Sequence, residues 1–168
     1  MPEEWIVWLP GVVPGLNMAA HTLSAQQHIM VPTPIYYPFL DIGENANLKQ
    51  ILTPLAVVDG TWRMDMERMR DDISKQTKMV FIASPQNPTG RAYAADELTA
   101  LAEFIEHNDL LLVSDDIHCN LIIDPEVYHL PIAHAVPEIA HRTITLFAAT
   151  KTYNIPGRPC AAAVIPNA

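Results

Sequence analysis

The chain has 168 residues, of which 49% are hydrophobic and 17% are charged. This length and this composition are typical of one folded globular domain and exclude an intrinsically disordered chain. The formal net charge is −9 and no stretch is rich in lysine and arginine, which argues against a nucleic-acid partner.

The two cysteines, Cys119 and Cys160, form no CxxC pattern and have no clustered histidines beside them in the sequence. We therefore expect no metal site and no disulfide framework, and we expect both thiols to be small buried side chains in a reducing cytoplasm. No apolar run reaches the about 20 residues of a membrane helix. The acidic start, MPEE, is unlike a signal peptide. The sequence thus predicts a cytoplasmic protein without a membrane partner.

The first predicted element is a helix over VPGLNMAAHTLS, residues 13–24, entered through a Gly-Pro turn. The stretch that follows, QHIMVPTPIYYPFL (residues 27–40), contains a strand-like core. Its prolines Pro32, Pro34 and Pro38 lack the backbone N–H that a strand needs. We therefore expect that no uninterrupted central strand runs through this stretch.

Two further helices are predicted from polar and apolar patterns. RMDMERMRDD, residues 63–72, is expected to form a helix with a solvated face. DELTALAEFIEHN, residues 96–108, carries acidic residues in its first turn, where the helix dipole favours them. Its apolar residues recur with the spacing of one helix face: Leu98, Leu101, Ala102 and Ile105.

Short continuous apolar runs separate these helices. They are KMVFIAS (residues 78–84), LLLVSDD (110–116) and TITLFAAT (143–150). Runs without alternation are typical of strands buried on both faces, as in parallel sheets covered by helices. The order of strands and helices therefore predicts an α/β domain with three layers, a mostly parallel sheet flanked by helices.

The polar residues that follow the apolar runs are expected to meet. The runs lead into SPQNPTG, SDDIH and ATKTYN, and the carboxyl ends of parallel strands lie at the edge where ligands bind. A lysine in a dry pocket, here Lys151, favours the neutral amine that attacks an aldehyde. Asp115 can keep a ring nitrogen protonated, and Asn87 can donate a hydrogen bond to a phenolate oxygen. These groups meet the requirements of pyridoxal phosphate (PLP).

The same motifs identify a family. SPQNPTGR, VSDDIH and ATKTYNIPG, in this order and spacing, resemble the fold-type I PLP enzymes of the class I/II aminotransferase superfamily. Together with TPIYYPF, they are most similar to the MalY/PatB-type cystathionine β-lyase branch, the C–S lyases. The resemblance covers nearly the whole chain and implies the large domain of a PLP-dependent transferase-like fold.

The resemblance implies roles for individual residues around the PLP ring. Lys151 would form the Schiff base with PLP and then move the proton of the substrate Cα. Asp115 would pair with the pyridine nitrogen, and Asn87 would hydrogen-bond O3′. Tyr36 would stack on the ring, with Tyr37 as the alternative.

Other residues are implied at the phosphate and near O3′. The backbone N–H groups of Gly11, Val12 and Val13 would hold the phosphate, because helix N-termini bind anions. Thr150 would add its hydroxyl group. His118 is expected either to support the contacts at O3′ or only to pack.

Two positions differ from the family pattern. Ala148 stands where many relatives carry a serine that helps to hold the phosphate. Arg158 lies one position before the place where aminotransferases tend to have a phosphate-binding arginine, and Pro159 restricts its backbone. The lyase branch often lacks this arginine, so the difference favours a lyase.

Some polar residues are expected to have no role in catalysis. We expect Asp116 to cap a turn or to face solvent. The remaining histidines, which include His129, show no spacing of metal ligands and are expected to play no special part.

The resemblance implies a C–S β-lyase that acts on cystathionine or related sulfur amino acids and releases pyruvate, ammonia and a thiol. An aminotransferase that passes the amino group to a 2-oxo acid is the enzyme alternative, and an inactive PLP-binding fragment is the non-enzyme alternative. Family members are longer, so residues 1–168 are expected to be the PLP-binding large domain alone. The N-terminal segment and the small domain with its carboxylate-binding arginine would lie outside it. Homodimer formation is implied for the full-length enzyme.

Overall fold

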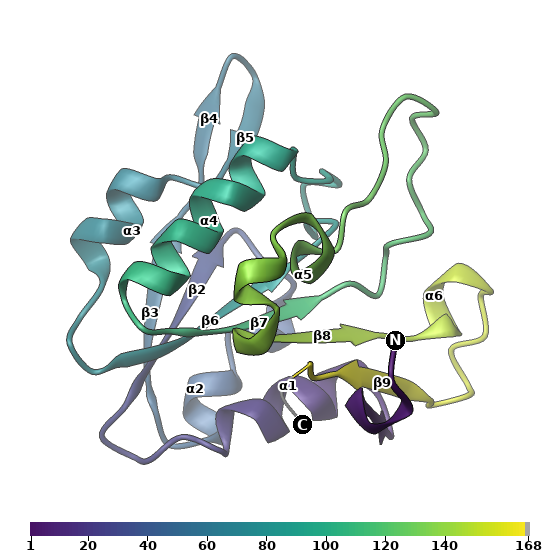
Figure 1. Ribbon diagram of the computed structural model, residues 1–168, viewed down its shortest axis with the longest axis horizontal. Helices are drawn as coiled ribbons and strands as arrows, with labels where there is room; N and C mark the ends of the chain where they lie inside the picture. Colours follow the sequence, from purple (N-terminus) through teal and green to yellow (C-terminus); the bar gives the residue numbers. More distant parts are fainter. Residues whose placement is uncertain (167–168) are drawn as a thin grey trace.

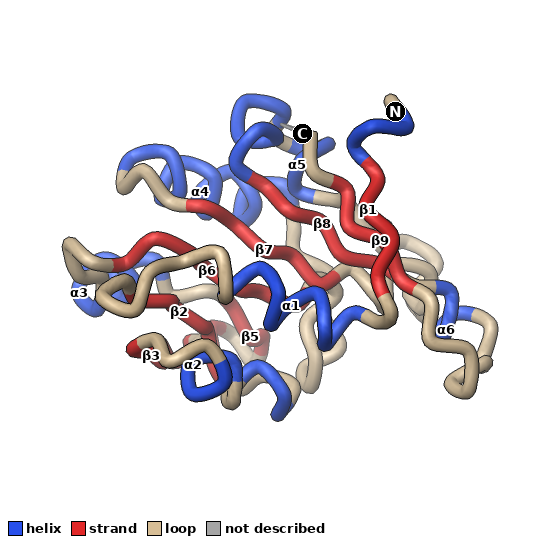
Figure 2. Tube along the Cα trace, turned by 90° about the horizontal axis from the view of Figure 1, so that it is seen from below, coloured by secondary structure: helices blue, strands red, loops and turns tan. Residues whose placement is uncertain are grey.

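The computed structural model describes residues 1–166 and shows a central β-sheet between two layers of helices (Figures 1 and 2). The strands are β1 (Ile6–Leu9), β2 (His28–Thr33), β3 (Lys49–Pro54), β4 (Ala56–Val58), β5 (Thr61–Arg63), β6 (Thr77–Ala83), β7 (Leu111–Asp115), β8 (Thr143–Phe147) and β9 (Ala161–Val164). The α-helices are α1 (Val12–Ala20), α2 (Ile42–Asn45), α3 (Met66–Asp72), α4 (Ala95–His107), α5 (Ile132–Ala135) and α6 (Ala149–Thr152). Short 3-10 helices cover Glu3–Trp5, Tyr37–Phe39 and Pro137–Arg142.

The main sheet is mostly parallel. Within the described residues it contains seven strands in the order β1-β9-β8-β7-β6-β2-β3, while β4 and β5 form a separate hairpin. The neighbouring pairs from β8 to β3 are parallel. Strand β9 is antiparallel to both of its neighbours, β8 and β1. The prediction of an α/β domain with a mostly parallel sheet is confirmed.

The continuous apolar runs are explained by burial on both faces of the sheet. In β6, Met79 and Phe81 pack with α1 and α2 on one face, which is the lower face in Figure 1. Val80 and Ile82 alternate with them and pack with α3, α4 and α5 on the other face. All four side chains are at most 1% exposed. Because neither face meets water, the strand needs no polar residue at alternate positions.

The prediction that prolines interrupt the strand after residue 27 is wrong for Pro32. This residue lies inside β2, which has β6 on one side and β3 on the other. The ladder to β6 extends only from His28 to Met30, whereas the ladder to β3 continues to Thr33. Pro32 therefore lies beyond the doubly paired part of the strand, where its missing N–H is tolerated.

The last predicted strand is shorter than its apolar run. TITLFAAT forms a strand only as far as Phe147, and residues 149–152 form the short helix α6. Consequently Lys151 lies on a helical turn after β8 rather than at the end of the strand itself. The predicted helix over residues 63–72 begins at Met66. Asp65 caps it, because its side chain accepts a hydrogen bond of 2.9 Å from the backbone N–H of Arg68.

Among the residues that the structure describes, no helix combines the length and the apolar character needed to cross a lipid bilayer.

Candidate active site

A cavity lies at the carboxyl ends of the parallel strands. Its volume is about 120 Å³, and it is lined by Val12, Val13, Tyr36, Ala83, Asn87, Asp115, Ile117, His118 and Lys151. Every one of these residues ends a strand or follows the carboxyl end of one: β1, β2, β6, β7 or β8. The cavity therefore lies where ligands bind in open α/β sheets.

Most of the predicted site residues meet in this cavity. Seven of the nine predicted residues line it. The two exceptions are Gly11 and Thr150, which directly precede Val12 and Lys151 in the chain. A larger hollow of about 930 Å³ lies between residues 90–94 and 121–130. That hollow contains neither a lysine nor a buried carboxylate, so it offers no comparable chemistry.

Asp115 is the buried carboxylate of the cavity. It is the last residue of β7, is 6% exposed, and accepts a hydrogen bond of 3.1 Å from the backbone N–H of Ile117. Burial raises its pKa to about 7, and the negative charge of Asp116 adds to this, whereas the Ile117 N–H and the positive charge of Lys151 act in the opposite direction. A cation placed against this carboxylate would favour its ionised form.

Lys151 reaches the cavity from α6, but it does not lie in a dry pocket. The residue is exposed, and so are all residues from Tyr153 to Cys160. Figure 1 shows this segment projecting from the body of the fold. The expectation of a buried lysine is wrong for the described chain, because no described element packs over α6. The lysine still acts on the cavity, since its charge lowers the pKa of Asp115 and of His118.

Asn87 is held by a loop with a buried glutamine beside it. Gln86 is 2% exposed, and its side-chain oxygen accepts hydrogen bonds from the backbone N–H of Thr89 (2.8 Å) and from the Thr89 hydroxyl (2.6 Å). Its Nε2 donates to the backbone oxygen of Pro34 at 2.6 Å. The backbone of Gln86 also bonds to Gly90 and to Arg91. The turn around Asn87 is therefore fixed from inside the protein.

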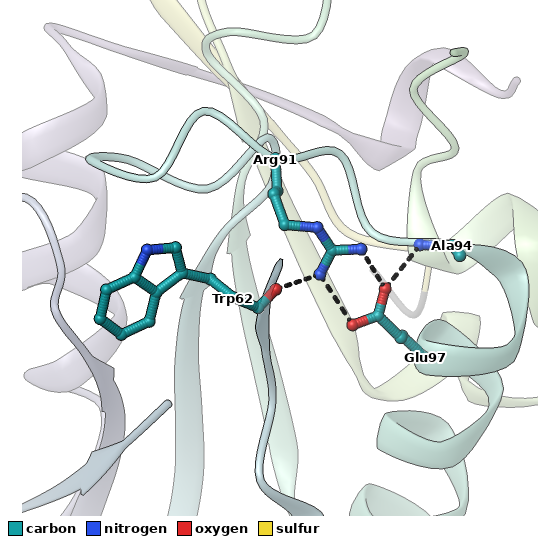
Figure 3. A network of polar contacts seen from close by, with 4 residues as sticks. All are labelled: Trp62, Arg91, Ala94 and Glu97. Atoms are coloured by element: carbon teal, nitrogen blue, oxygen red, sulfur yellow. Dashed lines mark hydrogen bonds and ion pairs between the residues drawn. The ribbon is translucent and has the colours of Figure 1, made fainter. Parts of the chain in front are cut away.

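The far end of the same loop is anchored to α4 by an ion pair (Figure 3). Arg91 donates two hydrogen bonds to Glu97, at 2.9 and 2.7 Å, and a further one to the backbone oxygen of Trp62. Glu97 also accepts a hydrogen bond of 3.1 Å from the backbone N–H of Ala94 at the start of the helix. Burial alone would raise the pKa of Glu97, but the hydrogen bonds from Arg91 and Ala94 outweigh it and lower the pKa. A paired set of hydrogen bonds between an arginine and a carboxylate fixes the orientation of both side chains and adds to the attraction between their charges.

Tyr36 is the tyrosine of the PIYYPF motif that lines the cavity. Its ring is half-buried and meets Tyr37 edge-on, with ring centroids 5.0 Å apart and an interplanar angle of 63°. Burial raises the pKa of Tyr36, and its contacts with Tyr37 add to this. Tyr37 is 68% exposed and does not line the cavity. The geometry therefore favours Tyr36 over Tyr37 as the stacking residue.

The N-terminus of α1 supplies backbone N–H groups to the cavity. Val12 and Val13 are its first two residues, and the first N–H groups of a helix have no partner within the helix. No side chain caps this end. Gly15 lets the helix lie close to the sheet, because a Cβ atom at this position would approach Leu9 Cδ1 to 2.7 Å. Such a helix end favours an anion.

His118 lies in the cavity rather than in the packed core. It is half-buried, and burial lowers its pKa, as does the positive charge of Lys151. Of the two alternatives for this residue, its place on the cavity wall with Asp115 and Lys151 favours support of the contacts in the site over packing alone.

The sequence did not reveal the role of Asp116. It is 2% exposed and accepts hydrogen bonds from Ser114 Oγ at 2.5 Å and from His129 Nε2 at 2.8 Å. The expectation that Asp116 caps a turn or faces solvent is therefore wrong, and so is the expectation that His129 plays no special part. Asp116 directly follows β7, and the alternation of side chains along an extended chain places it on the side opposite to Asp115. That alternation is the sequence signal that separates Asp116 from the cavity, whereas its burial depends on the partners that the fold brings to it.

The cysteines differ from the prediction in part. Cys119 is half-buried, but Cys160 is exposed rather than buried. Cys160 lies in the exposed segment after α6, where it has no core to join.

Comparison with known proteins gives one family. The sequence profile of the family "Aminotransferase class I and II" matches residues 2–168. Cystathionine beta-lyase PatB of Bacillus subtilis is 31% identical over 166 residues, which are 98% of this chain and 43% of PatB. The chain thus spans less than half the length of this curated relative.

Solved structures agree with this assignment. The crystal structure of OvoB superimposes with a TM-score of 0.96 and 38% identity, over 99% of this chain and 44% of that one. The PLP-bound C–S lyase of Staphylococcus hominis superimposes with a TM-score of 0.94 and 30% sequence identity, over 99% of this chain and 43% of the lyase. N-succinyldiaminopimelate aminotransferase of Mycobacterium tuberculosis superimposes with a TM-score of 0.90 and 26% sequence identity, over 99% of this chain and 43% of the aminotransferase. The predicted family and the predicted fold are both confirmed, and this chain belongs to the aminotransferase class I and II family.

Proposed function

We propose that this chain binds PLP and serves a C–S β-lyase that acts on cystathionine or a related sulfur amino acid. The observation that supports the proposal is the meeting of Lys151, Asp115, Asn87 and Tyr36 with the N-terminus of α1 around one cavity. Similarity to PatB and to a PLP-bound C–S lyase supports the lyase branch.

The groups around the cavity fit the parts of PLP. The free N–H groups at the start of α1 suit a phosphate. Asp115 is buried and has a raised pKa, and a protonated ring nitrogen would supply the cation that such a carboxylate lacks. The side-chain amide of Asn87 can donate to the ring oxygen, and the ring of Tyr36 can cover one face. Lys151 lines the same cavity and would supply the amine that bonds to the aldehyde carbon.

The chain's own residues would share the work of the reaction. Bound PLP supplies an electron-poor ring that accepts the electron pair left on the substrate Cα when its proton is removed. Asp115, as a carboxylate, would hold the proton on the ring nitrogen. Lys151 Nζ would release the aldehyde carbon to the substrate amine and then take the Cα proton. The β-thiolate would then leave and take up the proton held by Lys151 Nζ, which gives the thiol, and one water molecule would convert the remaining product to pyruvate and ammonia.

An aminotransferase is the second candidate, because it needs the same residues up to the loss of the Cα proton. The similarity to N-succinyldiaminopimelate aminotransferase supports it. Arg158 is exposed, is followed by Pro159, and does not line the cavity, which favours the lyase. An assay of the whole protein with L-cystathionine separates the two: pyruvate without any 2-oxo acid supports the lyase, and dependence on a 2-oxo acid supports the aminotransferase.

Lys151→Ala tests the role of the lysine. We expect the variant to lose all PLP that borohydride can fix to the protein, because the attaching amine is absent. Mass spectrometry of the reduced protein measures the attachment. Lys49→Ala removes an exposed lysine at the opposite end of the sheet and should retain fixed PLP. Fixed PLP on Lys151→Ala would refute the assignment.

Several family properties stay predictions. We propose that residues 1–168 act as the PLP-binding large domain and that an arginine elsewhere binds the substrate carboxylate. Homodimer formation and a cytoplasmic location are proposed on the family resemblance alone. If this piece holds PLP but turns over no substrate while a longer chain does, the domain assignment is supported, and the alternative of an inactive binding fragment describes the piece.

A further inference from the structure

Two loops carry cavity residues on either side of the gap between β2 and β6. Tyr36 follows β2, and Asn87 follows β6. The ladder between these strands ends at the pair Met30–Val80. Beyond that pair the backbones are no longer joined by sheet hydrogen bonds, so the spacing of the two loops needs another support.

The side chain of Gln86 spans this gap. Its Nε2 donates to the backbone oxygen of Pro34 at 2.6 Å, and Pro34 lies two residues before Tyr36. In the part of the chain that the structure describes, it is the only hydrogen bond between residues 34–40 and residues 84–91. The other end of the same amide accepts two hydrogen bonds from Thr89 and so closes the turn around Asn87.

Burial makes this bridge costly to lose. Gln86 is 2% exposed, and a buried amide is tolerated only when its polar atoms have partners. The loop that carries it is fixed at its far end, because Arg91 pairs with Glu97 on α4 (Figure 3). One side of the gap is therefore rigid, and the amide transmits that rigidity to the loop of Tyr36.

We propose that Gln86 is a positioning residue that sets the distance between Tyr36 and Asn87, and with it the width of the site for the PLP ring. Its meaning for PLP rests on the proposed function. Gln86 itself does not line the cavity and acts through its two neighbouring loops. The side chain joins the loops before any ligand arrives, so the bridge can be tested without PLP.

Gln86→Met removes the amide at similar size, and Gln86→Asn keeps the amide but shortens its reach by one carbon. We expect both variants to speed amide hydrogen exchange in residues 33–40 as well as in residues 85–91 of the PLP-free chain. The PLP dissociation constant should rise about tenfold, the effect of one unmade buried hydrogen bond. Two variants with the same expectation protect the test against a failure of either one to fold.

Gln27→Met is the matched control. Gln27 is half-buried, and its side-chain oxygen also accepts a backbone N–H three residues away, from Ser24 at 2.9 Å, but it bridges no second loop. It lies before β2, at the opposite end of the sheet. The control should leave exchange in residues 33–40 and the PLP affinity unchanged.

The outcomes separate the proposals. Faster exchange in residues 85–91 alone would show Gln86 to be only a turn former and would overturn the bridge. An unchanged PLP dissociation constant would overturn its positioning role. If the unaltered chain takes up no PLP, the proposed function fails, whereas the exchange experiment still decides whether Gln86 couples the two loops.

Discussion

Asp115 is a buried carboxyl group whose ionised form destabilises the folded chain when no cofactor is bound. Its pKa is about 7, above the ordinary value of 3.8, chiefly because of burial. Between these values the folded chain binds a proton that the unfolded chain has lost. The contribution of Asp115 to stability is therefore full below about pH 4 and is lost as the pH rises through about 7.

Asp115→Asn should remove this dependence. Asparagine has nearly the same shape and can still accept the hydrogen bond from Ile117, but it does not titrate. We expect the free energy of unfolding of the PLP-free variant to exceed that of the unaltered chain at pH 8, by up to about 4 kcal/mol. Urea unfolding at pH 5 and pH 8 measures it. A variant that is no more stable at pH 8 would contradict the pKa shift, and the same variant should bind PLP more weakly.

Asp116 and His129 form a buried pair on the other side of the sheet. The His129 side chain is 7% exposed and that of Asp116 is 3% exposed. Burial raises the pKa of Asp116, while the hydrogen bonds from His129 and Ser114 act against that rise. The pair also ties residue 129 to the end of β7 and so closes the long loop between them.

His129→Ala should destabilise the fold by about 3 kcal/mol, because the buried carboxylate of Asp116 would lose one of its two hydrogen-bond donors and keep only Ser114. Chemical denaturation at pH 7 measures the loss. His21→Ala removes an exposed histidine and should change the unfolding free energy by less than about 0.5 kcal/mol. Equal stabilities for the two variants would mean that the pair contributes nothing.

At the scale of elements, α2 depends on a glycine. A Cβ atom on Gly43 would approach Gln50 Cβ to 2.7 Å and the backbone oxygen of Leu48 to 3.1 Å. The Gly43 N–H also donates to Gln50 Oε1 at 2.8 Å. The helix therefore lies on β3 at a distance that only glycine permits.

Gly43→Ala should push α2 away from β3 and destabilise the chain by about 1–3 kcal/mol, as overpacked sites do. Thermal and urea unfolding measure the effect. Gly157→Ala is the control, since its Cβ would meet nothing within 4 Å. A stability of Gly43→Ala equal to that of the control would show that the helix moves without cost.

The elements differ in how well the sequence predicts them. The strands β6, β7 and β8 and the helix α4 were predictable because each buries a continuous or a regularly spaced apolar set. Strand β9 (Ala161–Val164) is three alanines and a valine, and β1 is four residues long, so neither carries a pattern of its own. Such strands form because they pair with neighbours that are distant in the sequence.

At the scale of the whole molecule, the sequence predicts that the site residues meet at one edge of the sheet. It does not predict the hydrogen bonds that hold those residues in place. Parallel strands bring Asn87, Asp115 and Lys151 to one edge by topology alone. The bond from Gln86 to Pro34 joins residues 52 apart, and the one from His129 to Asp116 spans 13 residues across a loop. Contacts of this kind depend on the folded geometry, so the sequence motifs name the groups that meet the ligand but not those that hold them.

All residues that line the candidate active site stand at the carboxyl ends of the strands, and none of them lies in the connections at the opposite end. There the chain places Asn47 and Asp109 with positive φ angles of 54° and 52°, and Asp109 pairs with Arg142 at 2.7 Å. Variants selected for heat tolerance can therefore change these amino-terminal connections while every residue that lines the cavity is kept, whereas variants meant to alter ligand binding belong at the carboxyl ends.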